Sequence, residues 1–148
     1  MTTCRGIRGA TTVEVNEAEA ILNATAELLE QIVAANDVCE EDVVSVIFTM
    51  TPDLDAVYPA VAARQLGWTH TALICTQEMA IAGSLPRCIR VLVHWNTDRP
   101  IDRVRHVVHG RVAPQPFDLV RFGVHRVHRP PPVPECAYGL VAVFLPVR

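Results

Sequence analysis

The stretch CIRVLVHW, residues 88–95, decides the fold class of this chain. Large apolar side chains occupy every second position from Ile89 onward, and the positions between them include Arg90 and His94. A period of two residues is typical of a β-strand, whose side chains alternate between the two faces of a sheet. The pattern therefore predicts a strand with one apolar face toward a core and with Arg90 on the opposite face.

Further strands are predicted on both sides of this segment. Residues 4–14 are rich in Thr and β-branched residues and predict a first strand, broken at Gly6 and Gly9. Residues 43–50 form a nearly continuous apolar run, typical of a strand that is covered on both faces. Two more strands are predicted at residues 71–75 and 104–112.

Two helices are predicted between these strands. The first begins after Asn16, which can cap it together with Glu19, and Asn36 and Asp37 end it. Its apolar residues share one face at helical spacing. The second helix is short, over residues 59–66, and Gly67 suits its C-terminal end. The resulting order, β-α-β-α-β-β-β, predicts a mixed β-sheet with helices packed on it, an α+β (or α/β) fold.

The composition of the chain changes at about residue 120. The segment HRVHRPPPVP, residues 125–134, is basic and proline-rich and has no periodicity. We therefore expect a folded domain over residues 1–119 and a divergent basic, proline-rich tail over residues 120–148.

Overall composition and charge narrow the class of protein. The chain is 50% hydrophobic and 20% charged, as in soluble globular proteins. It has neither a secretory signal nor the roughly 18-residue apolar run of a membrane helix, so we expect a cytoplasmic protein without a membrane partner. The net charge of −3 gives no reason to expect nucleic acid. The five cysteines are odd in number and lack a C-x-x-C spacing, which argues against a disulfide framework or a zinc site.

Familiar catalytic motifs are absent from the sequence. There is no nucleophile elbow, phosphate-binding loop, dinucleotide fingerprint or zinc-protease motif. Histidines occur three residues apart at 106 and 109 and at 125 and 128, a spacing that binds metal only on a helix, and neither segment predicts one. We therefore expect no metal site at these histidines.

Charged residues in apolar strands are the main chemical signal. Arg90 lies inside an apolar strand, Arg8 lies in the first strand, and Glu78 follows the predicted strand at residues 71–75. A charge in such surroundings needs a partner or a polar cavity, because burying it alone is costly. One carboxylate and two guanidinium groups at strand ends would suit a dicarboxylate ligand, although ordinary ion pairs would give the same pattern.

Four segments together resemble the signature segments of the monofunctional, α/β-barrel chorismate mutases: RGIRGATTVE (5–14), TPDLDAVYPA (51–60), CTQEM (75–79) and CIRV (88–91). Their order and spacing also match, and the resemblance extends over about residues 4–112. It implies a homotrimer that forms a pseudo-α/β-barrel with an active site at each subunit contact. It also implies the pericyclic (Claisen) rearrangement of chorismate to prephenate, a step of phenylalanine and tyrosine biosynthesis that needs no cofactor.

The resemblance also implies roles for individual residues. Arg90 would face the breaking ether oxygen and a carboxylate, and Arg8 would bind the side-chain carboxylate. Glu78 and Cys75 would meet the ring hydroxyl, while Arg64 would bind or guide a carboxylate near the mouth of the pocket. The other substrate-binding positions, an aromatic wall followed by the pocket lining, correspond to Tyr58, Ala60, Leu73 and Ile74.

Three positions depart from the family pattern. Val108 stands where the family has a tyrosine whose hydroxyl helps to hold a substrate carboxylate, and Val61 stands where it has a lysine. The family's late L-R-P-D segment reads QPFD here, at residues 115–118, so its arginine is missing. These changes bear on catalytic efficiency and on closure of the pocket mouth.

Two other functions stay open at this point. A catalytically weak metabolite-binding protein on the same trimeric scaffold is supported by the missing tyrosine at Val108. An unrelated enzyme on a similar scaffold, such as an imine deaminase that grips a carboxylate with arginine, is weakened by the absence of its motifs. An absorbance assay for loss of chorismate separates an enzyme from a binding protein.

Overall fold

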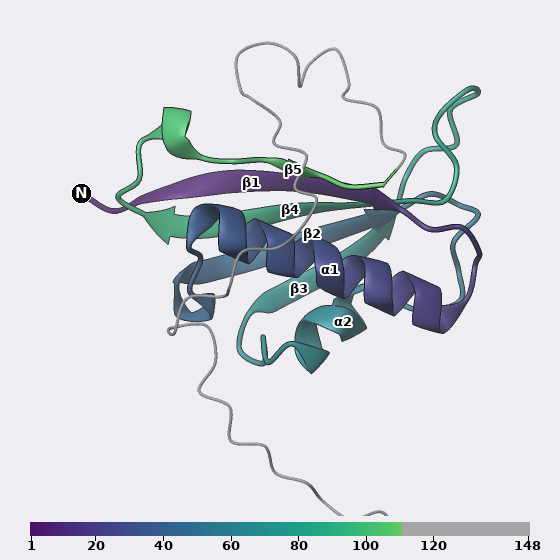
Figure 1. The fold of residues 1–148 in the computed structure, drawn as a ribbon, viewed down its shortest axis with the longest axis horizontal. Helices are drawn as coiled ribbons and strands as arrows, with labels where there is room; N and C mark the ends of the chain where they lie inside the picture. Colours follow the sequence, from purple (N-terminus) through teal and green to yellow (C-terminus); the bar gives the residue numbers. More distant parts are fainter. Residues whose placement is uncertain (111–148) are drawn as a thin grey trace, which may run out of the picture.

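A computed structural model describes residues 1–110 of the chain. Its helices and strands follow one another in the predicted order (Figure 1). They are β1 (Thr3–Thr12), α1 (Ala18–Asn36), β2 (Val43–Met50), α2 (Ala60–Gln65), β3 (Ala72–Gln77), β4 (Cys88–Thr97) and β5 (Val107–Val108). The prediction of an α+β chain with helices packed on a mixed sheet is confirmed.

The sheet is built around the strand that the opening sequence pattern predicted. Within residues 1–110 it has five strands in the order β3-β2-β4-β1-β5, so β4 is central among them. β4 is antiparallel to both of its neighbours, β1 and β2. The β2–β3 and β1–β5 pairs are parallel. Helix α2 lies in the connection from β2 to β3, as parallel neighbours require a crossover.

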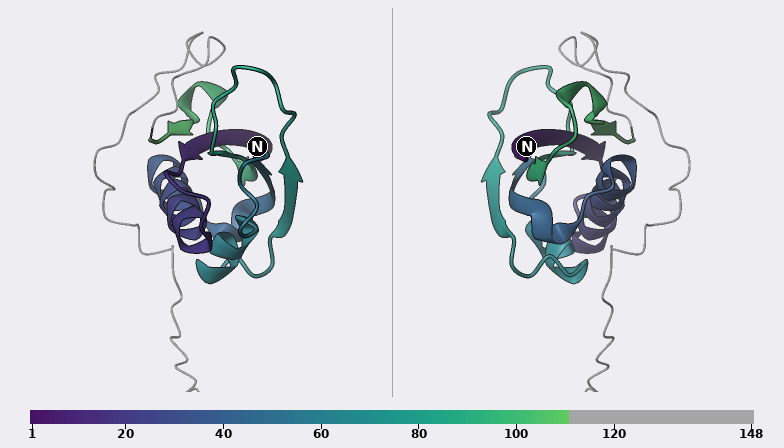
Figure 2. Two further views of the ribbon diagram at one scale, coloured as in Figure 1. Left: turned by 90° about the vertical axis from the view of Figure 1, so that its right-hand side faces the viewer. Right: turned by 90° about the vertical axis from the view of Figure 1, so that its left-hand side faces the viewer.

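Both helices lie on the same side of the sheet (Figure 2). The hydrophobic core fills the space between them and the sheet, with Phe48, Val91 and Val93 on the strands and Leu29 and Ile32 on α1, each at most 3% exposed. The alternation predicted for β4 is therefore confirmed. Neither helix in residues 1–110 combines the length and apolar character that crossing a membrane requires.

Strand β2 differs from the prediction that it is covered on both faces. Val46 and Phe48 are fully buried, whereas Val44 is 48% exposed and Ile47 is half-buried. The difference arises because both helices pack on one face, so that within residues 1–110 no helix covers the second face. The apolar side chains of that second face are thus only partly used by this chain's own core.

Strand β1 runs without the predicted break at Gly6 and Gly9. A Cβ at Gly9 would lie 2.7 Å from Cδ1 of Ile32 and 2.8 Å from Cγ1 of Val91. The missing side chain therefore lets α1 pack close to the sheet, and Gly9 serves packing rather than a turn.

The start of α1 corrects the prediction of an Asn16 cap. Glu17 occupies the N-cap position, and its side chain makes no capping hydrogen bond. Asn16 instead donates from Nδ2 to Oδ1 of Asp55 at 2.6 Å. Its Oδ1 accepts the backbone N–H groups of Asp55 and Ala56 at 3.1 and 3.2 Å. The predicted cap is wrong because a loop distant in sequence takes the hydrogen-bonding groups of this side chain.

The ends of both helices follow the prediction. Asp37 ends α1 in the left-handed conformation, with φ of 53°. Gly67, just after α2, has φ of 94°, a conformation that glycine adopts without strain.

Strand β5 is shorter than the predicted residues 104–112. Its two residues pair with Gly9 and Ala10 of β1. Before β5, the side chain of Asn36 donates to the carbonyl of Arg105 and accepts its backbone N–H, at 2.8 Å each. These backbone groups therefore do not join the sheet. The side chain of His106 accepts the backbone N–H of Arg8 at 3.1 Å. Side chains therefore replace the sheet pairing before Val107, and residues 111–112, the expected boundary after residue 119 and the tail of residues 120–148 lie outside the described residues.

Candidate active site

Arg90 lies on the face of the sheet that carries no helix. Its Cα partners across the ladders are Ala10 on β1 and Thr49 on β2. Directly paired residues share a face, whereas the adjacent Val91 points into the core. The strand pattern thus places one guanidinium, with a side chain 33% exposed, over the middle of the sheet.

Glu78 is held beside Arg90 by three contacts. It directly follows β3, and its backbone N–H donates to the carbonyl of Met50 at 2.8 Å. Its Oε2 forms an ion pair with Nη1 of Arg90, and its Oε1 accepts a hydrogen bond from the hydroxyl of Thr49 at 2.5 Å. The side chain is only 20% exposed, and each of its two carboxylate oxygens has a partner.

Arg8 lies on the same face of the sheet. Its Cα partner is Leu92, which follows Arg90 by two positions on β4 and therefore faces the same way. The side chain of Arg8 is exposed, and its backbone N–H is fixed by His106. The three residues that the sequence singled out as catalytic thus share one face, with Glu78 and Arg90 in direct contact.

Val108 also belongs to this face. It is the Cα partner of Ala10, which in turn is paired with Arg90, and the neighbouring Val107 is buried in the core. The position where the family has a tyrosine is therefore two strands away from Arg90 and is half-buried.

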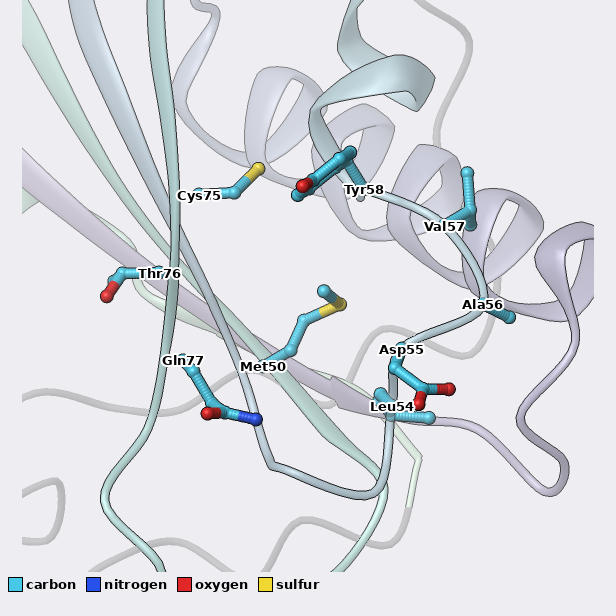
Figure 3. A pocket seen from close by; sticks show the side chains of 9 residues that line it. All are labelled: Met50, Leu54, Asp55, Ala56, Val57, Tyr58, Cys75, Thr76 and Gln77. Carbon is cyan, nitrogen blue, oxygen red and sulfur yellow. The ribbon is translucent and has the colours of Figure 1, made fainter.

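A second group of predicted residues lines a cavity at the opposite face. The cavity has a volume of about 500 Å³ and lies between β3 and the loop of residues 54–58 (Figure 3). Cys75, Met50 and Gln77 project into it, whereas Thr76 points away. Tyr58, on the facing loop, is 70% exposed.

The remaining predicted residues have mixed positions. Ala60 and Leu73 are partly buried and pack against the core. Ile74 is 59% exposed on the other face of β3, so it does not share a surface with Leu73. The guanidinium of Arg64 donates through Nη1 to the carbonyl of Trp68, near the C-terminal end of its own short helix.

The sheet separates the two groups within one chain. Phe48 in the core is paired with Cys75, whereas Thr49 on the opposite face is paired with Arg90. Cys75 and Arg90 therefore cannot line one pocket of a single chain. Sequence reasoning missed this division, together with the contact from Thr49. The only available signal for Thr49 was a polar residue spaced four positions from Ser45 in an otherwise apolar run.

The loop that carries Tyr58 is anchored at its start by Asp53. The carboxylate accepts the Thr51 hydroxyl at 2.5 Å and the backbone N–H of Arg87 at 2.9 and 3.1 Å. Burial on its own would raise the pKa of Asp53, but these hydrogen bonds and the charge of Arg87 outweigh it and lower the pKa below its ordinary value. Together with the Asn16 contacts, they fix both ends of the segment before Tyr58.

Asp53→Asn is expected to lower the melting temperature at pH 7 by a few degrees. A carboxylate whose pKa is depressed in the folded state stabilises the fold above its unfolded pKa, and this contribution is lost as the pH falls through the folded pKa. The gap between wild type and variant should therefore be full above about pH 5 and shrink below about pH 4. Thermal unfolding followed by circular dichroism from pH 7 to pH 3 measures it, and a gap independent of pH would contradict the role of the charge.

The two cysteines near the candidate site are protonated thiols at neutral pH. Burial raises the pKa of Cys75, an effect partly offset by a hydrogen bond with the backbone of Ala60. Burial also raises the pKa of Cys88 to about 11. Cys75 can therefore act as a hydrogen-bonding thiol toward a ligand, and neither thiol is suited to be a nucleophile. Among residues 1–110, no group of three His, Cys, Asp or Glu residues is arranged to hold a metal ion.

Comparison with known proteins gives one consistent family. Residues 4–114 match the family described as chorismate mutase type I. The chain is 51% identical over 110 residues to chorismate mutase AroH of Bacillus subtilis (strain 168), across 74% of this chain and 87% of that protein. It is 54% identical over 104 residues to chorismate mutase AroH of Thermus thermophilus, across 70% of this chain and 85% of that protein.

A solved structure agrees with these sequence matches. The structure of a chorismate mutase from Clostridium thermocellum is similar to this chain, with a TM-score of 0.72 and 48% identity. The similarity covers 72% of this chain and 96% of that one. Both groups of candidate residues, on the two faces of the sheet, lie within the family match at residues 4–114.

Proposed function

Because the chain belongs to the chorismate mutase type I family, we propose that it rearranges chorismate to prephenate in sites assembled between neighbouring copies of a homotrimer. The enzyme is an isomerase of aromatic amino acid biosynthesis. The proposal includes a cytoplasmic location. The observation that carries the proposed activity is the Arg90–Glu78 pair, on the sheet face that no helix covers within residues 1–110.

The reaction makes modest chemical demands on the protein. One carbon–oxygen bond of the ether breaks and one carbon–carbon bond forms within the same molecule, so neither a nucleophile nor a cofactor has to take part. Catalysis then depends on holding the substrate in its folded, reactive conformer. It also depends on stabilising the negative charge that develops on the ether oxygen.

We call the helix-free face of the sheet that carries Arg8, Glu78 and Arg90 the charged face. These three residues meet the demands of the reaction. In the proposal, Arg90 binds the ether oxygen and a carboxylate, and Arg8 binds the side-chain carboxylate of the substrate. Glu78 accepts a hydrogen bond from the ring hydroxyl. This assignment is supported by the common face of the three residues and by the low exposure of the Glu78 side chain.

The opposite face of the sheet, which carries Cys75 and the cavity, is here called the cavity face. It supplies the other half of the proposed site. Cys75 meets the ring hydroxyl as a thiol, Tyr58 forms a wall of the pocket, and Arg64 guides a carboxylate near the mouth. Ala60 and Leu73 complete the lining on this face, whereas Ile74 would line the pocket from the opposite face of β3, the face that carries Arg90. Because Cys75 and Arg90 lie on opposite faces of one sheet, both can touch one substrate only when they come from different copies.

Exposed apolar side chains around β3 support this assembly. β3 is an edge strand, so one side of its backbone has no partner within residues 1–110. Tyr58, Ile74, Met79 and Ile81 lie on or near it and are 59–80% exposed. Large apolar side chains gathered at an unpaired edge are typical of a protein–protein interface.

We expect the protein in solution to be a trimer. A trimer brings the cavity face of one copy to the charged face of the next and closes with three identical contacts. Light scattering coupled to size exclusion should give a particle of three times the 16.3 kDa chain mass. A monomer at micromolar concentration that still turns over chorismate would contradict the shared site.

The proposed activity is tested by the absorbance of chorismate. Purified protein should consume chorismate and form prephenate in equal amounts without any added metal or cofactor. Binding of chorismate without turnover would instead favour the catalytically weak binding protein, which the valine at Val108 makes the second candidate.

A further inference from the structure

We infer that Thr49 is a positioning residue for the catalytic pair, acting through Glu78 rather than on the substrate. The inference rests on the proposed function, because it assigns Thr49 to the chemistry of Arg90 and Glu78. It concerns a residue in the middle of the charged face that is not among the site residues predicted from the sequence.

The geometry around Thr49 is that of a residue built to hold Glu78. It lies on β2 between Arg90 of β4 and Thr76 of β3, its two Cα partners. Its hydroxyl donates to Oε1 of Glu78 at 2.5 Å, and Oε2 of the same carboxylate pairs with Arg90. The carboxylate is therefore held at both oxygens by two adjacent strands.

The strand also limits how Thr49 and Glu78 can move. The backbone N–H of Glu78 donates to the carbonyl of Met50 at 2.8 Å, so Glu78 is anchored to the residue that follows Thr49. The β-branched side chain of threonine has few rotamers, and the register fixes its backbone. The hydroxyl is thus pre-positioned and does not have to be ordered when substrate binds.

This contact affects how Glu78 meets Arg90. A carboxylate with both oxygens available tends to grip a guanidinium through two parallel hydrogen bonds. Occupation of Oε1 by Thr49 opposes that arrangement and keeps the carboxylate turned so that Oε2 meets Arg90. Loss of the hydroxyl would let Glu78 rotate toward a two-point grip that competes with the ether oxygen for Arg90.

The test compares Thr49→Val, Thr49→Ser and a matched control, Ser45→Ala. Valine keeps the shape of threonine without the hydroxyl, and serine keeps the hydroxyl. Ser45 lies on the same strand and face, but its hydroxyl contacts Nδ1 of His94 at 2.9 Å and not the Arg90–Glu78 pair. Ser45→Ala therefore removes a similar hydrogen bond from the strand without touching the catalytic pair.

We expect kcat of Thr49→Val to fall about tenfold, as for loss of one hydrogen bond to a charged group that matters in the transition state. KM should change less, because the carboxylate-binding guanidinium groups are still present. Thr49→Ser and Ser45→Ala should both stay within about threefold of wild type. Melting temperatures of the four proteins show whether folding accounts for any difference.

The outcomes separate this inference from the proposed function. If the wild-type protein turns over chorismate and kcat of Thr49→Val lies within twofold of the wild-type value, the inference is overturned and the proposed function is left intact. A Thr49→Ser variant as slow as Thr49→Val would also overturn it, since the hydroxyl would then not be the active element. A wild-type protein without turnover would overturn the proposed function, and with it the positioning role.

Discussion

Replacing Arg90 with alanine is expected to lower kcat by two to three decades, about 3–4 kcal/mol of transition-state stabilisation. The ether oxygen of chorismate gains negative charge as its bond to carbon lengthens. A fixed guanidinium binds that oxygen more strongly in the transition state than in the neutral ground state, which is the condition for raising kcat. Arg90 is suited to this because the central strand of the sheet and Glu78 both fix it.

The form of the cation matters as well as its charge. Arg90→Lys should also be a poor enzyme, because one ammonium group cannot reproduce the planar fork that spans two oxygens. Glu78→Ala should lose less activity than Arg90→Ala, since Glu78 is proposed to contact the ring hydroxyl and not the breaking bond.

Steady-state kinetics on these variants check the prediction, with circular dichroism to confirm folding. Arg99→Ala is a matched control: Arg99 bonds Asp37 at 2.7 Å and lies over the Trp95 ring, away from the candidate site. It should keep wild-type kcat. A folded Arg90→Ala protein with more than about a tenth of wild-type kcat would contradict the mechanism, which requires a loss of two to three decades.

Phe48→Ala is expected to have the largest effect on stability, a loss of about 3–5 kcal/mol. Phe48 is fully buried in the core. It lies on β2, and its Cα partners are Val91 of β4 and Cys75 of β3. Removing the ring takes away its burial and leaves a cavity that the close-packed neighbours fill only in part.

The control for this variant comes from the same strand. Val44 is 48% exposed, so Val44→Ala should change stability by less than about 1 kcal/mol. Urea unfolding at a fixed protein concentration compares the two variants with wild type. Equal destabilisation by both would show that the helix-covered face of β2 does not form the main core.

Much of the fold, and the family, could be predicted from the sequence. The period of two in residues 88–95 predicted the central strand and the face of Arg90, because side-chain alternation is a local property of extended backbone. The order of helices and strands followed from similar local patterns. Four segments that match the signature segments of the family in order and spacing predicted the family. The charges of Arg8, Glu78 and Arg90 suit the dicarboxylate substrate of that family.

Tertiary structure alone decided the features that depend on contacts between distant segments. Asn16 serves a loop 39 residues away instead of capping α1, and Asn36 and His106 shorten β5 by replacing its backbone pairing. Local patterns do not contain these contacts, since a polar side chain can satisfy either a nearby or a distant group with similar energy.

The division of the site is the clearest case of the same limit. The sequence predicted Cys75 and Arg90 as parts of one pocket, and the register of β2 with its two neighbours put them on opposite faces of the sheet. Register is set by pairing among three strands that are far apart in the chain, and a shift of one residue exchanges the faces. The amino-acid sequence therefore predicted which residues could contribute to the chemistry, whereas the packing of the sheet decides which of them one chain can bring together.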